Sequence, residues 1–288
     1  MRSRFLSIIL TAVMLIAVVS TSCNAPMKYG DTIPFDNPET ILKNYFSLMA
    51  ANDYGKAYDM LSIETRKGFT KDQFLELQDL YTQSNYIFTN AVSTIQEGNL
   101  PAVDSVRYAS ASLFSSKLDY ADGNAGVTST QQMNYYIVAE DGSWKVHLPN
   151  SKITYQNFIV YALTRLGLMY SAGTKVAVDK AKALEYFQKV LTYVPKNSII
   201  HTYAALTCLD LEQYDQAMTY INKAAGETKK NEELINIYCV KAAIYAKTNK
   251  TADANKWFDK AQVLEDALPP DSTKPDIVAN FRAKYLPQ

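Results

Sequence analysis

The stretch "LGLMYSAGTKVAVDKAKALEYFQKVLTYVP", residues 166–195, decides the architecture of the second half of the chain. Small and apolar residues recur in it at helical spacing, first before the "SAGTK" segment and again after "VDK". Such spacing is typical of one face of an α-helix. The pattern therefore predicts two helices, with Leu166, Gly167 and Tyr170 on the first and Ala183, Phe187, Val190 and Pro195 on the second.

The same pattern returns twice farther along the chain. Ala183, Ala217 and Ala254 occupy equivalent places, 34 and then 37 residues apart. Small residues at helix crossing points let paired helices approach closely, while aromatic residues fill the remaining gap. Stacked units of this kind form a solenoid, whose ends need caps. We expect helix pairs at about 157–195, 198–226 and 232–266, followed by a capping helix at 275–286.

The loop between the first two expected helices carries a more specific signature. Gly173, Val176, Asp179, Lys182 and Ala183 fit the pattern G-x-x-V-x-x-D-x-x-K-A of Sel-like repeats. The segment 152–288 thus resembles an array of tetratricopeptide repeats of the Sel-like kind. The positions expected to pack these repeats are Leu166, Gly167, Tyr170, Ala183, Phe187, Ala205, Ala217, Ala224, Ala242, Tyr245, Ala254, Phe258 and Ala261.

Arrays of this family bind partners on the concave surface made by the first helix of each repeat. The resemblance carries the family's groove positions onto Tyr161, Thr164, Leu168, Ile199, Thr202, Leu206, Leu209, Asn236 and Cys239. This set is apolar and nearly uncharged, unlike the basic clamp with which chaperone-binding members hold peptide carboxylates. Two interpretations stay open: a protein or peptide partner occupies the groove, or the first domain or the terminal helix fills it.

The N-terminal segment is typical of a secretory signal peptide, because Arg2 and Arg4 precede a 15-residue apolar stretch at 5–19. A helix of that length would span about 22 Å, less than the ~30 Å hydrocarbon core of a membrane. The residues Ser20, Thr21 and Ser22 that lead to Cys23 resemble the cleavage region of a bacterial lipoprotein, although Ser20 stands where that family usually has Leu. An ordinary signal peptide or a short membrane anchor is the alternative.

The lipoprotein resemblance implies removal of the signal peptide 1–22 and attachment of fatty acids such as palmitate at Cys23. Two or three acyl chains hold a protein on a membrane almost permanently. Asn24, where an Asp would favour the inner membrane in enteric bacteria, points to the outer membrane. The Pro- and Gly-containing segment 23–36 is expected to be a tether.

The segment 37–150 is expected to be an α+β domain. Asn37 and Pro38 predict a helix start, and residues 37–83 predict three helices. After Ser84, β-branched and aromatic residues predict strands in the segments 86–95, 106–114 and 129–148, the last with Asp141 and Gly142 at a hairpin turn. This order resembles the nuclear-transport-factor-like cone fold of ketosteroid isomerases and SnoaL-type polyketide cyclases. The expected fold class is a cone-fold α+β domain followed by an all-α tetratricopeptide-like solenoid.

The charge balance argues against a strongly basic surface for nucleic acid, because 29 acidic residues match 29 basic ones. No metal-binding, phosphate-loop or hydrolase motif is present, so we expect no cofactor. Spacing of the expected helices puts Cys208 and Cys239 too far apart for a disulfide. In the last strand of the cone domain, alternation places Trp144 in the core and predicts that His147 faces solvent or a domain seam.

The sequence therefore predicts a non-enzymatic envelope lipoprotein. It would act as an adaptor or scaffold that binds an envelope protein or peptide through its repeats and the membrane through Cys23. One alternative is a protein that binds a small apolar ligand in the pocket of the cone domain. Another is an enzyme of hydrolase or isomerase type, in which His147 or a buried carboxylate would line that pocket beside a Tyr hydroxyl.

Overall fold

The computed structural model describes residues 27–122, 127–174, 176–269 and 276–286. The expected signal peptide 1–22 and Cys23 lie outside these residues. The chain divides into two compact units. Unit 1 comprises Met1–Lys71, Phe88–Tyr120 and Ser129–Thr154, and unit 2 comprises Asp72–Ile87, Ala121–Thr128 and Tyr155–Gln288.

Three helices open the described chain: α1 (Pro38–Ala50), α2 (Tyr54–Asp59) and α3 (Ile63–Gly68). The predicted start of α1 is confirmed, since the Asn37 side chain accepts a hydrogen bond from the Glu39 amide and Pro38 follows it. The Asp53 side chain caps α2 in the same way. Helix α3, which begins where the Ser62 hydroxyl accepts a hydrogen bond from the Thr65 amide, was not predicted from the sequence.

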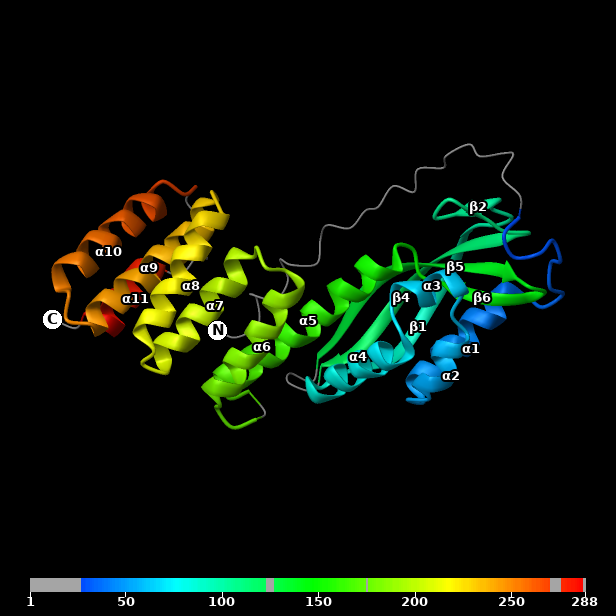
Figure 1. Ribbon diagram of the computed structural model, residues 1–288, viewed down its shortest axis with the longest axis horizontal. Helices are drawn as coiled ribbons and strands as arrows, with labels where there is room; N and C mark the ends of the chain where they lie inside the picture. Colours follow the sequence, from blue (N-terminus) through cyan, green and yellow to red (C-terminus); the bar gives the residue numbers. More distant parts are fainter. Residues whose placement is uncertain (1–26, 123–126, 175, 270–275, 287–288) are drawn as a thin grey trace. The chain divides into compact units, whose positions relative to one another are not determined.

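A four-stranded antiparallel sheet follows, in the order β1 (Tyr86–Glu97), β4 (Ala111–Asp122), β5 (Val127–Glu140), β6 (Ser143–His147) (Figure 1). The predicted β5–β6 hairpin is confirmed, with Tyr136 opposite His147 and a turn at Asp141 and Gly142, where φ is 50° and 75°. Positive φ at both central residues matches the twist of the two strands.

A small hairpin of β2 (Ala102–Val103) and β3 (Val106–Arg107) precedes β4. The sequence pattern predicts a single strand over residues 106–114. The structure corrects this, because the chain leaves β3 after Arg107 and enters β4 only at Ala111. In between, the buried side chain of Tyr108 packs with Val103, Ala111 and Val138.

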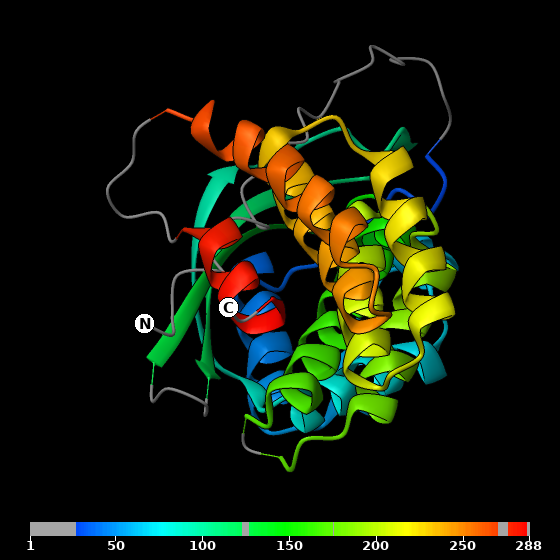
Figure 2. The ribbon, with the colours of Figure 1, turned by 90° about the vertical axis from the view of Figure 1, so that its left-hand side faces the viewer.

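Unit 2 contains all of α4 (Lys71–Gln83) except its first residue, together with the helices of the second half of the chain. These are α5 (Ser151–Ala172, from Tyr155), α6 (Lys180–Tyr193), α7 (Ser198–Asp210), α8 (Tyr214–Glu227), α9 (Asn231–Lys247), α10 (Thr251–Asp266) and α11 (Ile277–Tyr285). Helix α7 packs on α8, α9 packs on α10, and α9 also contacts α7, α8 and α11. Figure 2 shows α8, α9 and α10 side by side.

The turn that joins α7 to α8 is built again between α9 and α10. At Glu212 and at Asn249, 37 residues later, φ is 59° and 58°. In the first turn the amide of Gln213 donates to the carbonyl of Cys208. In the second the amide of Lys250 donates to the carbonyl of Tyr245. Two segments of different sequence thus close their helix pairs with the same hydrogen bonds.

The positions predicted to pack the repeats lie at helix contacts. A Cβ on Gly167 would come within 2.6 Å of the Phe187 ring, so α5 and α6 approach closely there. Tyr170 and Tyr245 are half-buried, and the other predicted packing positions are buried. Among the residues that the structure describes, no helix has the length and apolar character needed to cross a membrane.

Candidate functional site

The predicted groove positions lie on α5, α7 and α9. Their exposure is unequal. Buried are Thr202, Leu209 and Cys239. Half-buried are Tyr161, Thr164, Leu168, Ile199, Leu206 and Asn236.

The α5 end of this set is covered from within unit 2. The Tyr86 ring packs edge-on against Tyr161, with 5.5 Å between ring centroids. The Arg165 guanidinium lies 4.9 Å from the Tyr86 centroid, and its Nε donates to the carbonyl of Ser84 at 3.3 Å. Tyr161 is therefore engaged by the chain itself.

The α9 end is covered by the terminal helix. Cys239 lies in a cluster with Phe258 of α10 and Val278 of α11. The Glu265 carboxylate accepts the amide of Ile277 at 2.8 Å, which fixes the start of α11. The apolar groove positions that keep partial exposure are Leu168 on α5 and, seven residues apart on one face of α7, Ile199 and Leu206.

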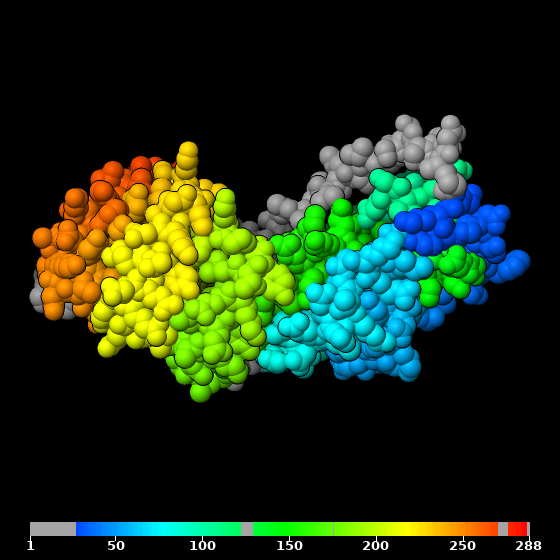
Figure 3. Space-filling view, viewed as in Figure 1, coloured from blue at the N-terminus to red at the C-terminus, as the bar shows by residue number. Residues whose placement is uncertain are grey.

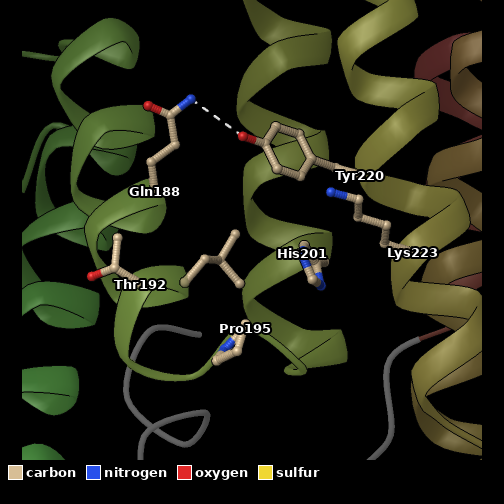
Figure 4. Close-up of a pocket in the computed structure, with 7 residues that line it drawn as sticks. Gln188, Thr192, Pro195, His201, Tyr220 and Lys223 are labelled. Carbon is tan, nitrogen blue, oxygen red and sulfur yellow. Dashed lines mark hydrogen bonds between the residues drawn. The ribbon is translucent and has the colours of Figure 1, made fainter.

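A pocket of about 310 Å³ lies among α6, α7 and α8, outside the predicted set. Figure 3 shows the surfaces of these three helices as adjoining bands from green to yellow. The residues that line the pocket are Gln188, Leu191, Thr192, Pro195, His201, Tyr220 and Lys223 (Figure 4).

The pocket offers hydrogen-bond donors to a ligand. Gln188 Nε2 donates to Tyr220 Oη at 3.2 Å, so the hydroxyl hydrogen of Tyr220 stays available (Figure 4). His201 is buried, and its Nδ1 lies 2.8 Å from a carboxylate oxygen of Glu227, which holds the ring in place. Lys223 has no partner among the described residues. The sequence did not predict this pocket, because the repeat resemblance pointed to first helices, whereas most of the pocket residues lie on the second helices α6 and α8.

The structure corrects the prediction for His147, a residue that is only 1% exposed although Trp144 is also buried. The β2–β3 turn covers that face of β6, and Asp104 Oδ2 lies 3.2 Å from His147 Nε2. On the other side of the ring, Nδ1 lies 3.0 Å from Ser62 Oγ. Burial raises the pKa of Asp104 and the hydrogen bond from His147 lowers it, with a lowered pKa as the net result.

The hydrogen-bonded residues Ser62, His147 and Asp104 are of the types found in a nucleophilic triad, but their role here is structural. Ser62 is fully buried, and its hydroxyl oxygen already accepts the Thr65 amide at the start of α3. The three residues therefore tie α3, β6 and the β2–β3 turn together. Nearby, the hydroxyl of Tyr108 is buried without a hydrogen-bond partner among the described residues, and burial raises its pKa.

Within the described ranges, no group of three or more His, Cys, Asp or Glu side chains could hold a metal ion. Cys208 and Cys239 are free thiols in the interior of unit 2. Burial raises the pKa of Cys208 to about 11 and that of Cys239 to about 12, which disfavours the reactive thiolate.

In comparisons with known proteins, no family model and no curated protein matches this chain.

Proposed function

We propose that this chain is a lipid-anchored protein of the bacterial envelope, on the outer membrane, whose helical half binds a protein or peptide partner. In this proposal the α+β half is a cone-type domain and the helices form a tetratricopeptide-like solenoid. The chain performs no catalysis. Its anchor at Cys23 confines it to a thin layer, which raises its effective concentration for other envelope proteins.

The observation that supports an adaptor best is the repeated helix hairpin of unit 2. The α7–α8 and α9–α10 turns share φ values and hydrogen bonds at an offset of 37 residues. The first helices of these pairs, α7 and α9, contact each other. Repeated hairpins whose first helices adjoin present a continuous surface to a partner.

The proposed contact is the α7 face with Ile199 and Leu206. It is apolar and half-exposed, and Asn236 on α9 lies beyond it with its amide bonded to the Glu232 carbonyl. An apolar face of this kind fits an amphipathic helix or an extended apolar segment of a partner.

The test is crosslinking of the full chain in native membranes, followed by identification of the captured proteins. Leu206→Asp and Ile199→Asp should each remove a specific partner, because a charge would enter the apolar contact. Val263→Asp is the matched control, since Val263 is a 69% exposed apolar residue on α10. Leu209 is not used, because at 4% exposure its replacement would test folding. A partner set that survives both α7 changes would contradict the proposal.

The anchor has its own test. Cys23→Ser should move the protein from the membrane fraction to the soluble fraction, because the sulfur that carries the diacylglycerol is gone. Continued membrane attachment of this variant would show that the N-terminal segment itself holds the protein.

Small-molecule binding is a second candidate, favoured by the pocket among α6, α7 and α8. Leu191 and Pro195 offer apolar contact there, and Lys223 and Tyr220 offer donors to an anion. The fluorescent anion 8-anilinonaphthalene-1-sulfonate is a suitable probe. Lys223→Glu should weaken its binding, whereas Lys247→Glu, an exposed change on α9, should not. Equal binding to both variants would exclude this pocket as the site.

A further inference from the structure

The chain is bound to unit 1 well before its first helix. The Lys28 amide donates to the Arg107 carbonyl at 3.2 Å, and the Asp141 amide donates to the Tyr29 carbonyl at 3.1 Å. The Trp144 indole nitrogen donates to the Asp36 carbonyl at 2.6 Å. The segment expected to be a tether, 23–36, is therefore attached from Lys28 onward (Figure 1).

Tyr29 is the anchor of this attachment. Its side chain is 9% exposed and its ring stacks on Tyr108, with 5.8 Å between centroids. Its hydroxyl donates a short hydrogen bond to Glu64 of α3. The same carboxylate oxygen pairs with Lys28 Nζ at 2.6 Å and with Lys67 Nζ at 2.9 Å. One buried ring and one shared carboxylate thus hold the segment.

This attachment shortens the chain that can separate unit 1 from a membrane. Cys23 precedes Lys28 by five residues, so its reach is at most about 18 Å, whatever path those residues take. If the first attachment were instead at Pro38, the same argument would allow about 50 Å. The end of unit 1 that holds Tyr29 must therefore lie close to the lipid that carries Cys23.

We propose that this end of unit 1 faces the lipid headgroups of the membrane that holds Cys23. The surface comprises the β5–β6 turn at Asp141 and Gly142, the neighbouring Lys28, and Lys67 on α3. This inference rests on the proposed acylation of Cys23.

Two lysines of this surface can contact lipid headgroups. The side chains of Lys28 and Lys67 are 49% and 55% exposed and share a single carboxylate, that of Glu64. Their exposed ammonium groups can meet anionic headgroups, but with Asp141 the surface carries no net charge, so the short reach from Cys23 to Lys28 is the argument for a membrane as the occupant.

Energy transfer to labelled lipids tests the inference by comparing two dye positions at opposite ends of β5. The acylated full chain is placed in vesicles of phosphatidylethanolamine and phosphatidylglycerol that contain a headgroup-labelled acceptor lipid. A donor dye is attached at Asp141→Cys or, as the matched control, at Thr130→Cys. Thr130 is exposed on β5, ten residues before Glu140 and hence about 33 Å along the strand. The native thiols Cys208 and Cys239 are buried and do not compete for dye.

Transfer from position 141 should exceed transfer from position 130 about twofold or more, given this separation. Insertion of a twelve-residue Gly-Ser segment after Pro26 should remove the difference, because unit 1 could then rotate freely. Tyr29→Ala should also reduce the difference in transfer between the two positions. Tyr29→Phe keeps the stacked ring and should reduce this difference less.

The outcomes separate this inference from the proposed anchor. Protein that fails to float with the vesicles contradicts acylation, and Cys23→Ser provides the reference for that result. Protein that floats but gives equal transfer from both positions, or more from position 130, contradicts the proposed surface and leaves the anchor standing.

Discussion

At the scale of single residues, close packing explains why certain positions take only small side chains. Gly167 is the clearest example, because Phe187 occupies the space that a Cβ would need. Gly226 on α8 is the opposite case, with no atom within 4 Å of a Cβ added there. The spacing of the sequence indicated that Gly167 lies at a helix crossing, whereas the identity of the opposing ring is decided by the tertiary structure.

Gly167→Ala should lower the free energy of unfolding of unit 2 by about 1–3 kcal/mol, because the buried Phe187 ring cannot move aside. Gly226→Ala should be neutral or stabilise by up to about 1 kcal/mol, through the better helix propensity of Ala. Urea unfolding followed by Trp257 fluorescence in a Trp144→Phe background measures both. Equal effects of the two changes would contradict the close approach of α5 and α6.

Glu64 provides a prediction about pH. Burial raises its pKa, hydrogen bonds from Lys28, Tyr29 and Lys67 lower it, and the result is a pKa of about 2. A lowered pKa means that the carboxylate stabilises the fold above its ordinary value near 4.5 and loses this effect as pH falls toward 2.

Glu64→Gln should therefore reduce the free energy of unfolding of unit 1 by about 1–3 kcal/mol at pH 7. The difference between the wild type and this variant should shrink steadily from pH 5 to pH 2. Urea unfolding across this range, followed by Trp144 fluorescence in a Trp257→Phe background, gives the comparison. Glu97→Gln, an exposed change on β1, is the control. A difference that stays constant with pH would show that Glu64 does not act through its charge.

At the scale of elements, local signals located most helices and the best hairpin. The Asn37 cap marked α1 and the Asp141–Gly142 pair marked the β5–β6 turn, since both depend on neighbouring residues alone. Helix α3 was not predicted, because six residues are too few to show a helical periodicity of apolar side chains. The β2–β3 hairpin was not predicted, because each of its strands has only two residues and β3 lies inside a run, 106–114, that has the pattern of a single strand.

Ser62→Ala tests the element contacts around α3. It removes the helix cap and leaves His147 Nδ1 buried without its partner, so unit 1 should lose about 2–4 kcal/mol of unfolding free energy. Asp179→Ala removes an exposed cap at the start of α6 and should cost unit 2 only about 0.5–2 kcal/mol. Denaturant unfolding measures each loss. A cost for Ser62→Ala no larger than for Asp179→Ala would mean that His147 finds another partner.

At the scale of the whole molecule, the chain covers much of the surface that the repeat pattern offered to partners. Tyr86 engages α5, and α11 engages α9 and α10. The sequence left open whether the groove is filled from within or by a partner. These contacts assign its two ends to the chain itself, and the α7 face stays as the proposed docking surface.

Removal of α11 tests whether this helix shields Cys239 of α9. Deletion of residues 269–288 should make Cys239 react with a thiol reagent in the folded protein, because Val278 and its neighbours no longer shield it. Cys208, which does not belong to that cluster, should stay unreactive and serves as the internal control. Phe281→Asp should have the same effect in smaller degree. A Cys239 that stays unreactive in both variants would show that α9 and α10 shield it alone.

The sequence by itself determined the order of elements, the α+β character of the first half and the helical character of the second. These follow from side-chain periodicity, caps and turns, which act over a few residues. Tertiary structure alone decided that His147 is buried, that the chain attaches to unit 1 from Lys28, and that a pocket opens among α6, α7 and α8. Each of these depends on residues far apart in the chain, such as Asp104 and His147 or Tyr29 and Glu64. Local pattern carries no information on such pairs, because their contact forms only when distant elements pack.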